Sequence, residues 1–368
     1  MIDHKINHTI LIAGGGSGGH LFPALAIGDA LHNKGYSIKY IGSQYGIESK
    51  ILKKLNNEYY LLNIRGIQRT LSFKNIINNL LFPIRFLISY LITKRILKRL
   101  NPMIVIGTGG YASGLPLLAS IRMNIKTLIH EQNSYPGLTT RKLSNKVDSV
   151  CITTLEAKKY LNGNIILTGM PIRNNFLKIN KLDACIKLGL SSNKKTIFVV
   201  GGSQGSETFN KYFKKNYEFY IKNDIQLIWQ CGYKNLSRYK KKVNHKNILI
   251  KDFFNNIDHA YCAADIIISR AGAVAVNEIS FMKKAMILVP LPSSAANHQF
   301  HNAKFFEDNN AALMIEEKKL TGNIIEESIL KLFKNKEKLQ LMGLNASNLI
   351  IKDAKEKIID QVTRLLKI

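Results

Sequence analysis

The sequence predicts an α/β protein built from two similar domains, each with a parallel β-sheet covered by helices. Short apolar runs alternate with longer helix-compatible stretches along all 368 residues. The runs are continuously apolar rather than alternating, which is typical of strands buried on both faces. TILIAGG at 9–15 is echoed by TIFVVGG at 196–202, and a helix-compatible segment follows each. The repeat indicates two domains of one architecture.

The expected strands, in chain order, cover residues 9–13, 37–41, 103–107, 126–130, 149–152, 196–200, 226–230, 247–251, 265–269 and 286–290. The predicted N-terminal domain spans 1–171 and the predicted C-terminal domain spans 172–348. The boundary falls in GMPIRNNF (169–176), where glycine and proline interrupt regular structure. The helical stretch 349–368 is expected to pack back on the N-terminal domain.

The composition is strongly basic, with 53 Lys and Arg against 25 Asp and Glu and a formal net charge of +28. Such an excess favours anionic partners, namely phosphorylated substrates, an anionic membrane or nucleic acid. Compositional drift in a sequence rich in Lys, Asn and Ile is an equal explanation. The four cysteines lie far apart and indicate free thiols. Neither a cleaved signal peptide nor a membrane-spanning helix is expected.

A glycine-rich segment, AGGGSGGHLFP, follows the first expected strand at 13–23. Backbone N–H groups at such a strand-to-helix turn favour phosphate binding. Gly14, Gly16 and Gly19 match G-x-G-x-x-G, but the second strand ends in YIGSQ without an acid, and Glu48 is the first acid beyond it. That argues against a dinucleotide site and hence against a dehydrogenase. The P-loop pattern is also missing, and tight helix packing is the alternative role for these glycines.

His20 is expected at the start of the helix that follows this loop. The helix dipole disfavours an imidazolium ion there, so the neutral, proton-accepting form dominates near pH 7. A neutral imidazole facing an anion-binding cleft fits a general base. A structural histidine is the alternative.

Three further segments carry polar or glycine-rich patterns after strands: GTGGYASG (107–114), HEQN (130–133) and RAGAVAVNE (270–278). The carboxyl ends of parallel strands are where open α/β sheets bind ligands. Glu278, two turns into its expected helix, suits a sugar diol, or is an ordinary solvated acid.

Metal chemistry is not expected, and no cofactor is predicted. His298 and His301 have i, i+3 spacing, but no acid or cysteine lies near them in the sequence. No D-x-D triplet occurs. A leaving diphosphate would therefore be stabilised by helix dipoles, backbone amides and basic side chains.

Taken together, the ordered segments GGGSGGHLFPALAIG, GTGGYASG, HEQN, GMPIR, GGSQGS, RAGAVAVNE and HQFHNA resemble the MurG family of bacterial glycosyltransferases, over residues 14 to about 303. The resemblance implies the GT-B fold, in which two Rossmann-like domains face each other across a cleft. It implies an inverting transfer of N-acetylglucosamine from UDP-N-acetylglucosamine to the 4-OH of the muramyl sugar of lipid I, giving lipid II and UDP.

The resemblance also implies roles for individual residues. His20 is the expected general base, and Glu131 is the alternative. Ser17, Gly18 and Gly19 are expected near the acceptor diphosphate and the donor sugar. The expected donor contacts are Asn133, Gln299 and Asn302 with the sugar, Arg173 and Ser203 with the phosphates, the Phe254 backbone with uracil, Ala273, Val274, Ala275, Val276 and Asn277 with the nucleotide, and Glu278 with the ribose.

Three segments depart from the usual family pattern. Ser17 replaces threonine and keeps the hydroxyl, and GMPIR replaces GNPVR but keeps Pro171 and Arg173. LPSSAANHQFHNA differs from a more charged stretch, which weakens the sugar contacts expected there.

A lipid-linked acceptor requires access to a membrane, and the resemblance implies the cytoplasmic face of the inner membrane. Residues 71–100 combine apolar bulk with a basic end, which suits insertion into an anionic lipid surface. We expect Leu81, Phe82 and Phe86 to enter the lipid while another face of the helix is buried in the protein. Enzymes of cell-wall synthesis are possible protein partners.

Two alternatives remain from the sequence. One is another enzyme of this fold that uses UDP-N-acetylglucosamine, either an epimerase or a transferase with a soluble acceptor. The other is a basic nucleic-acid-binding protein. The basic residues are spread along the chain without a recognition module, so no nucleic-acid partner is expected.

Overall fold

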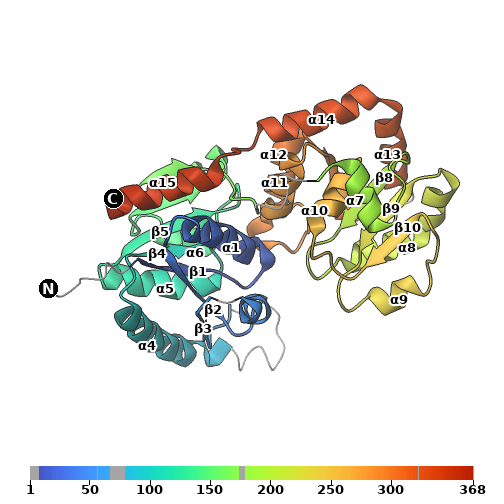
Figure 1. Cartoon of the computed structure of the whole chain (residues 1–368). Helices are drawn as coiled ribbons and strands as arrows, with labels where there is room; N and C mark the ends of the chain where they lie inside the picture. The colour runs from blue at the N-terminus through green and yellow to red at the C-terminus, as the bar shows by residue number, and fades with distance from the viewer. Residues whose placement is uncertain (1–7, 56, 67–78, 174–178, 322, 368) are drawn as a thin grey trace. The chain divides into compact units, whose positions relative to one another are not determined.

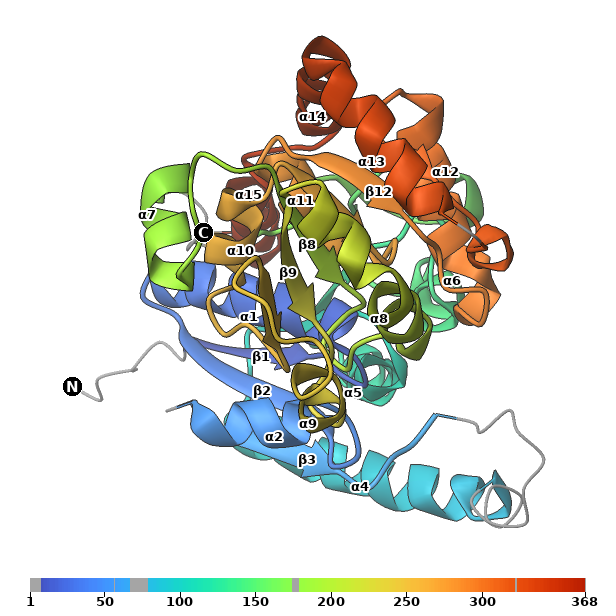
Figure 2. The same ribbon diagram turned by 90° about the vertical axis from the view of Figure 1, so that its right-hand side faces the viewer.

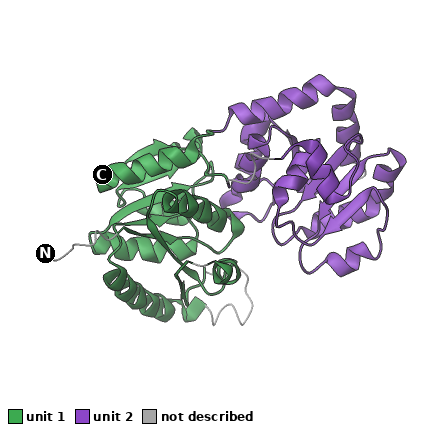
Figure 3. Cartoon of the chain, viewed as in Figure 1, with its two compact units in different colours: residues 1–172, 351–368 green, residues 173–350 purple. Residues whose placement is uncertain are grey.

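The computed structural model describes residues 8–55, 57–66, 79–173, 179–321 and 323–367. The chain divides into two compact units, residues 1–172 with 351–368 and residues 173–350 (Figure 3). Two predicted segments lie partly outside the described residues. The break at 169–176 is described to residue 173, and the membrane segment 71–100 is described from residue 79.

The first unit is built on an all-parallel sheet whose described strands follow the order β3-β2-β1-β4-β5-β6-β7. The strands are β1 Thr9–Ala13, β2 Ser37–Ser43, β3 Tyr59–Leu62, β4 Ile104–Gly107, β5 Lys126–Glu131, β6 Ser149–Ile152 and β7 Ile165–Leu167. The helices are α1 Gly18–His32, α2 Glu48–Ile51, α4 Phe82–Leu100, α5 Tyr111–Arg122, α6 Leu138–Leu143 and α15 Ala354–Leu366 (Figure 1).

The second unit holds another parallel sheet, with its described strands in the order β10-β9-β8-β11-β12-β13. The strands are β8 Thr196–Val200, β9 Gln226–Gln230, β10 Ile248–Lys251, β11 Ile266–Ser269, β12 Ala285–Leu288 and β13 Leu313–Met314. The helices are α7 Lys181–Leu188, α8 Glu207–Lys222, α9 Leu236–Lys240, α10 Ile257–Ala263, α11 Ala273–Phe281, α12 His298–Asp308, α13 Ile324–Lys334 and α14 Lys336–Asn348 (Figure 2).

The two sheets share one topology over their first five strands, and this confirms the predicted pair of Rossmann-like parallel sheets. In each unit the first strand of the repeat, β1 or β8, lies between the second and the fourth strand. The chain therefore turns to opposite sides of the sheet at β1 and β4, and again at β8 and β11. Ligands of open α/β sheets bind at such switch points, beyond the carboxyl ends of the strands.

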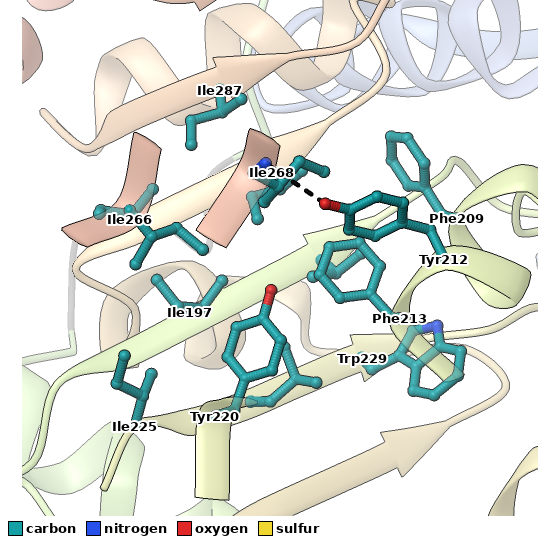
Figure 4. Packing of buried hydrophobic residues seen from close by; sticks show 14 of the residues in the cluster. Ile197, Phe209, Tyr212, Phe213, Tyr220, Ile225, Trp229, Ile266, Ile268 and Ile287 are labelled. Atoms are coloured by element: carbon teal, nitrogen blue, oxygen red, sulfur yellow. Dashed lines mark hydrogen bonds between the residues drawn. The ribbon is translucent and has the colours of Figure 1, made fainter. Parts of the chain in front are cut away.

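The core of the second unit is rich in aromatic side chains (Figure 4). Trp229 on β9 is fully buried, and its ring centroid lies 6.4 Å from that of Phe213 on α8. Its indole Nε1 donates to Asn210 Oδ1 at 3.0 Å. The polar edge of the indole is thereby satisfied inside the core, as buried Trp requires. This packing holds α8, and the loop that precedes it, against the sheet.

The C-terminal helix α15 belongs to the first unit and completes its core. Ile358 and Val362 are buried in the same apolar cluster as Ile10 and Ile12 of β1. Gln361 Nε2 donates to Ser149 Oγ at 3.1 Å. The last residues of the chain therefore cover a sheet formed by its first residues.

Replacing Ile358 with alanine should destabilise the first unit by about 2–5 kcal/mol, because the substitution leaves a cavity in a fully buried cluster. Asp360→Ala, an exposed position on the same helix, is the matched control and should change stability by less than about 0.5 kcal/mol. Urea denaturation followed by far-UV circular dichroism measures both. Equal stability of the two variants would contradict the packing described for α15.

Candidate active site

The loop after β1 is held in place by a buried carboxylate. Glu48 is fully buried, and its Oε2 accepts from the Gly16 N–H at 2.7 Å, while Oε1 accepts from the Ser43 N–H at 2.9 Å. The sequence prediction offered the whole loop as phosphate donors, but the Gly16 N–H is already used by Glu48. The N–H groups of Ser17, Gly18 and Gly19 lie instead at the N-cap and first turn of α1, on the outer side of the loop. That position suits an anion.

His20 lies in the first turn of α1, and its ring is enclosed by glycines from the loop after β4. A Cβ atom at Gly109 would lie 2.8 Å from His20 Nδ1, and one at Gly110 would lie 3.0 Å from His20 Cδ2. Both glycines also have positive φ, of 90° and 74°. The GTGG segment therefore makes room for the imidazole, a role that its spacing alone did not indicate.

One nitrogen of His20 faces two oxygen acceptors. Nδ1 lies 3.1 Å from the Thr108 carbonyl oxygen and 3.0 Å from Gln132 Oε1. Gln132 is the third residue of HEQN, so the segment predicted to contribute a catalytic acid contacts the histidine through its amide. The sequence analysis missed both partners, because Thr108 acts through its backbone and glutamine carries no charge.

Glu131, the alternative general base, is buried and its carboxylate accepts four hydrogen bonds. Oε1 accepts from the backbone N–H and the side-chain Nδ2 of Asn133, both at 3.0 Å. Oε2 accepts from the Gly137 N–H at 3.1 Å and from Thr140 Oγ1 at 2.5 Å. This carboxylate shapes the turn between β5 and α6, and it fixes the Asn133 amide at the edge of the site.

A cavity of about 340 Å³ lies in the second unit at its own switch point. It is lined by Gly201, Gly202, Gly205, Ser206, Glu207, Thr208, Ser269, Arg270, Gly272, Ala275, Leu291 and Gln299. These residues come from the loop after β8 and the start of α8, from the end of β11 and the loop after it, from the first half of α11, from the loop after β12 and from the start of α12. Of the predicted donor contacts, Ala275 and Gln299 line the cavity, and Ser203 belongs to the loop on its rim.

Two predicted donor residues, Arg173 and Glu278, contact each other. The Arg173 Nε and Nη2 atoms donate to Glu278 Oε1 at 3.1 and 2.7 Å, and Tyr261 donates to Glu278 Oε2 at 3.4 Å. Burial raises the pKa of the Glu278 carboxyl, and the Arg173 guanidinium opposes that shift. The two side chains predicted to contact the ribose and the phosphates therefore form an ion pair with each other.

Backbone and amide groups around the cavity are linked by hydrogen bonds. Gln230 joins the Phe254 N–H, at 3.0 Å from its Oε1, to the Gly202 carbonyl, at 2.9 Å from its Nε2. Gln299 Oε1 accepts from the Leu291 N–H at 3.0 Å. Asn302 is buried and donates to the Ala271 carbonyl at 3.1 Å. Asn302 thus supports the loop after β11, and the sugar contact expected of it stays a prediction.

Arg270, which the sequence analysis did not single out, lines the cavity but is fully engaged. Its guanidinium donates to Ser206 Oγ at 2.8 Å and to the Val289 carbonyl at 3.2 Å, and it pairs with Glu317. Burial lowers its pKa, although Glu317 opposes the shift. Arg270 therefore ties together the loops after β8, β11 and β12.

Helix α4 and the turn before it carry an exposed apolar surface, which includes one of the three residues predicted to enter lipid. Phe86 is half-buried and packs on the core of the first unit, and Phe82 lies against it with ring centroids 5.9 Å apart. Exposed apolar side chains, from 49% exposed for Leu91 to 73% for Leu80, form a stripe made of Leu80, Ile84, Leu87, Ile88 and Leu91. Leu81 is exposed beside it. Phe86 is therefore partly covered by the core of the first unit, and its insertion into lipid stays a prediction.

The described residues contain no helix with the length and apolar character needed to cross a bilayer. Within the same residues, no three or more His, Cys, Asp or Glu side chains come together in a way that would hold a metal ion.

Both units match family models. Residues 10–152 match the glycosyltransferase family 28 N-terminal domain, and residues 196–362 match the C-terminal domain of that family. The chain is 36% identical to a UDP-N-acetylglucosamine–N-acetylmuramyl-(pentapeptide) pyrophosphoryl-undecaprenol N-acetylglucosamine transferase of Christiangramia forsetii, with 97% of each chain covered. It is 32% identical to the protein of the same name from Flavobacterium psychrophilum, with 98% of each covered.

Solved structures agree with these sequence matches. MurG of Acinetobacter baumannii superposes with a TM-score of 0.72 at 25% identity, covering 97% of this chain and 99% of its own. A UDP complex of MnaA from S. aureus gives a TM-score of 0.69 at 13% identity, covering 98% and 96%. At that identity, the second likeness concerns the fold alone.

The buried histidine of HEQN should make the protein sensitive to acid. His130 is fully buried, and burial lowers its pKa to about 4, although a hydrogen bond to Gly169 and the charge of Glu131 oppose the shift. The unfolded chain takes up this proton near pH 6.5, and the folded chain only near pH 4. The contribution of His130 is therefore fully present above pH 6.5 and is lost as the pH falls toward 4.

We expect this one group to lower the free energy of unfolding by about 2 kcal/mol between pH 7 and pH 4.5. Urea denaturation at the two pH values measures the loss, which should be smaller by that amount in His130→Gln. His32→Gln, an exposed position at the end of α1, is the control and should behave as the wild type. The same loss in His130→Gln as in the wild type would contradict the prediction.

Proposed function

The chain belongs to the MurG family of glycosyltransferases, and from that premise we propose how its residues carry out the reaction. The enzyme transfers N-acetylglucosamine from UDP-N-acetylglucosamine to N-acetylmuramyl-(pentapeptide) pyrophosphoryl-undecaprenol, the lipid I acceptor, and releases UDP. The observation that carries this function is similarity over both units, at 32–36% identity, to relatives whose names state this one activity.

The UDP-sugar binds the second unit at the cavity between the loops after β8 and β11. Uracil meets the backbone at Phe254, and the diphosphate lies over Ser203 and the first turn of α11, where helix N–H groups favour negative charge. N-acetylglucosamine reaches Gln299 at the cavity wall. Asn133 of the first unit adds an amide for the same sugar.

Nucleotide binding exchanges the partners of Arg173 and Glu278. The two ribose hydroxyls donate to the Glu278 carboxylate, and the freed guanidinium moves to the phosphates, where it offsets the charge of the leaving UDP. The ion pair keeps the buried carboxylate satisfied until the nucleotide arrives, since an unpaired charge there would be costly.

The acceptor diphosphate binds at the N-terminus of α1, against the N–H groups of Ser17, Gly18 and Gly19. Acceptor binding there brings the 4-OH of the muramyl sugar to His20. The hydroxyl oxygen attacks C1 of N-acetylglucosamine as the bond from C1 to the UDP oxygen breaks, which inverts the anomeric centre. His20 Nε2 takes the hydroxyl proton.

His20 is a better general base than Glu131 for a geometric reason. The Glu131 oxygens already accept four hydrogen bonds, and the residue is only 1% exposed. His20 is half-buried, and both known contacts of its ring use Nδ1, so the second nitrogen is available to substrate.

Peripheral attachment to the cytoplasmic side of the inner membrane is the third part of the proposal. The exposed stripe Leu80, Ile84, Leu87, Ile88 and Leu91 enters the lipid interface, and Arg95, Lys98 and Arg99 on the same helix meet anionic head groups. The acceptor is lipid-linked, so this attachment brings the first unit to its substrate.

His20→Ala should lower the rate of transfer to lipid I by roughly 100- to 10,000-fold, the usual contribution of a general base. Binding of UDP-N-acetylglucosamine should stay unchanged, because the donor site lies in the second unit. Transfer of labelled sugar to a lipid I analogue measures the rate, and titration calorimetry measures the binding. His32→Ala, on the same helix, is the control. Full activity of His20→Ala would remove His20 from the mechanism.

Replacing Leu87 and Ile88 together with glutamine should weaken binding to anionic vesicles roughly 30-fold. Each half-exposed side chain contributes about 1 kcal/mol when it enters the lipid. The control is the same double change at Leu182 and Ile186 of α7, which are similarly exposed but lie in the second unit. Vesicle sedimentation measures the partition. If the two double variants bind alike, α4 is not the attachment surface.

A further inference from the structure

We propose that His130 and Gln132 are positioning residues that hold His20 with its proton on Nδ1 and its lone pair on Nε2. This inference rests on the proposed role of His20 as general base. A base that acts through Nε2 is useful only in one of the two neutral tautomers of imidazole, so a group that selects the tautomer contributes to the rate. Four groups of the first unit make that selection through hydrogen bonds whose donors and acceptors are fixed: the Gly169 carbonyl, His130, Gln132 and the Thr108 carbonyl.

The series of hydrogen bonds begins at a backbone carbonyl, which fixes which atom donates at each later step. His130 Nε2 lies 2.9 Å from the Gly169 oxygen, which can only accept, so Nε2 carries a proton. His130 is fully buried and neutral at pH 7, since burial lowers its pKa to about 4. A neutral imidazole has a single N–H, and Nδ1 of His130 is therefore an acceptor.

This acceptor orients the amide of Gln132. Gln132 Nε2 lies 3.1 Å from His130 Nδ1 and 2.8 Å from the His130 carbonyl oxygen. Both of these partners accept, so the NH₂ group must face them and the amide oxygen must face the other way. A flipped amide would set its oxygen against two lone pairs.

The amide oxygen then fixes His20. Gln132 Oε1 and the Thr108 carbonyl oxygen lie 3.0 and 3.1 Å from His20 Nδ1, and neither can donate. Nδ1 must carry the proton and share it between the two oxygens, which leaves Nε2 unprotonated. When Nε2 takes the proton of the acceptor hydroxyl, the two oxygen dipoles stabilise the positive charge on the ring.

The arrangement also accounts for three glycines of the first unit, Gly109, Gly110 and Gly169. Gly109 and Gly110 lack the Cβ atoms that would hold the His20 ring away from Gln132. Gly169, with φ of 86°, lies against Ile351, where its own Cβ would be 2.6 Å from the Ile351 Cβ. The Gly169 carbonyl, where this relay of hydrogen bonds through His130 and Gln132 to His20 begins, is thus positioned by the chain segment that leads into α15.

The tautomer can be read directly, without an activity assay, from long-range ¹H–¹⁵N correlation spectra of protein labelled with ¹⁵N-histidine at pH 7.5. His20→Ala and His130→Gln assign the two signals. We expect the Nδ1–H form for His20 and the Nε2–H form for His130. The opposite tautomer for either ring in the wild type overturns the proposal.

Gln132→Met then tests the contribution to the rate, because it keeps the length of the side chain and removes both polar ends. We expect His20 to populate both tautomers and kcat to fall roughly five- to tenfold, the effect of losing one neutral hydrogen bond. KM for the UDP-sugar should not change. Thr153→Val is the matched control, because it removes a buried hydrogen bond to the Glu131 carbonyl nearby and should leave tautomer and kcat unchanged.

The outcomes separate this inference from the proposed mechanism. An unchanged His20 tautomer and an unchanged kcat in Gln132→Met would overturn the positioning role alone. Full activity of His20→Ala, with the tautomer still shifted by Gln132→Met, would show that the relay orders the ring but that another group is the base.

Discussion

The close approach of the loops after β1 and β4 is the constraint on which the candidate active site depends. A Cβ atom at Gly14 would lie 2.0 Å from Thr108 Oγ1, and one at Gly110 would lie 2.6 Å from the Gly15 carbonyl oxygen. Only bare backbone permits this contact. Because the loops touch, His20 reaches the Thr108 carbonyl and the HEQN segment beyond it. The glycines therefore serve first to bring three strand ends together, and they leave the first turn of α1 partly exposed.

Several charged residues near the two sites hold loops in place instead of facing open solvent. Glu48, Glu131 and Arg270 are buried and bonded to several partners each, as a charge removed from water must be. His20 and Arg173 remain partly exposed. The buried residues hold loops at the carboxyl ends of the strands, and in the proposed mechanism the partly exposed His20 and Arg173 meet substrate. A carboxylate within a motif is thus a weak indicator of catalysis until its partners are known.

Helix α4 is apolar on two faces, one packed against the first unit and one exposed. Ile96 and Leu97 are buried and Phe86 packs on the core of the first unit, while the stripe from Leu80 to Leu91 is exposed. Apolar residues on both sides of a helix give no clear pattern in the sequence, since the hydrophobic face that marks a surface helix is missing. Which phenylalanine faces the protein was decided by the position of the helix on the sheet.

The sequence by itself determined the fold class and the central strands. TILIA, SVCI, TIFVV and QLIWQ coincide with β1, β6, β8 and β9, because a strand covered on both faces must be apolar throughout. The edge strands β3, β7 and β13 were missed, since their half-buried side chains leave no such run. The motifs also marked the loops that form the site. Only the tertiary structure decided that Gln132 contacts His20, that Glu131 is a support and that Arg173 pairs with Glu278. The contacts of Gln132 with His20 and of Arg173 with Glu278 join residues 112 and 105 positions apart, and the direction of a hydrogen bond depends on partners that no local pattern specifies.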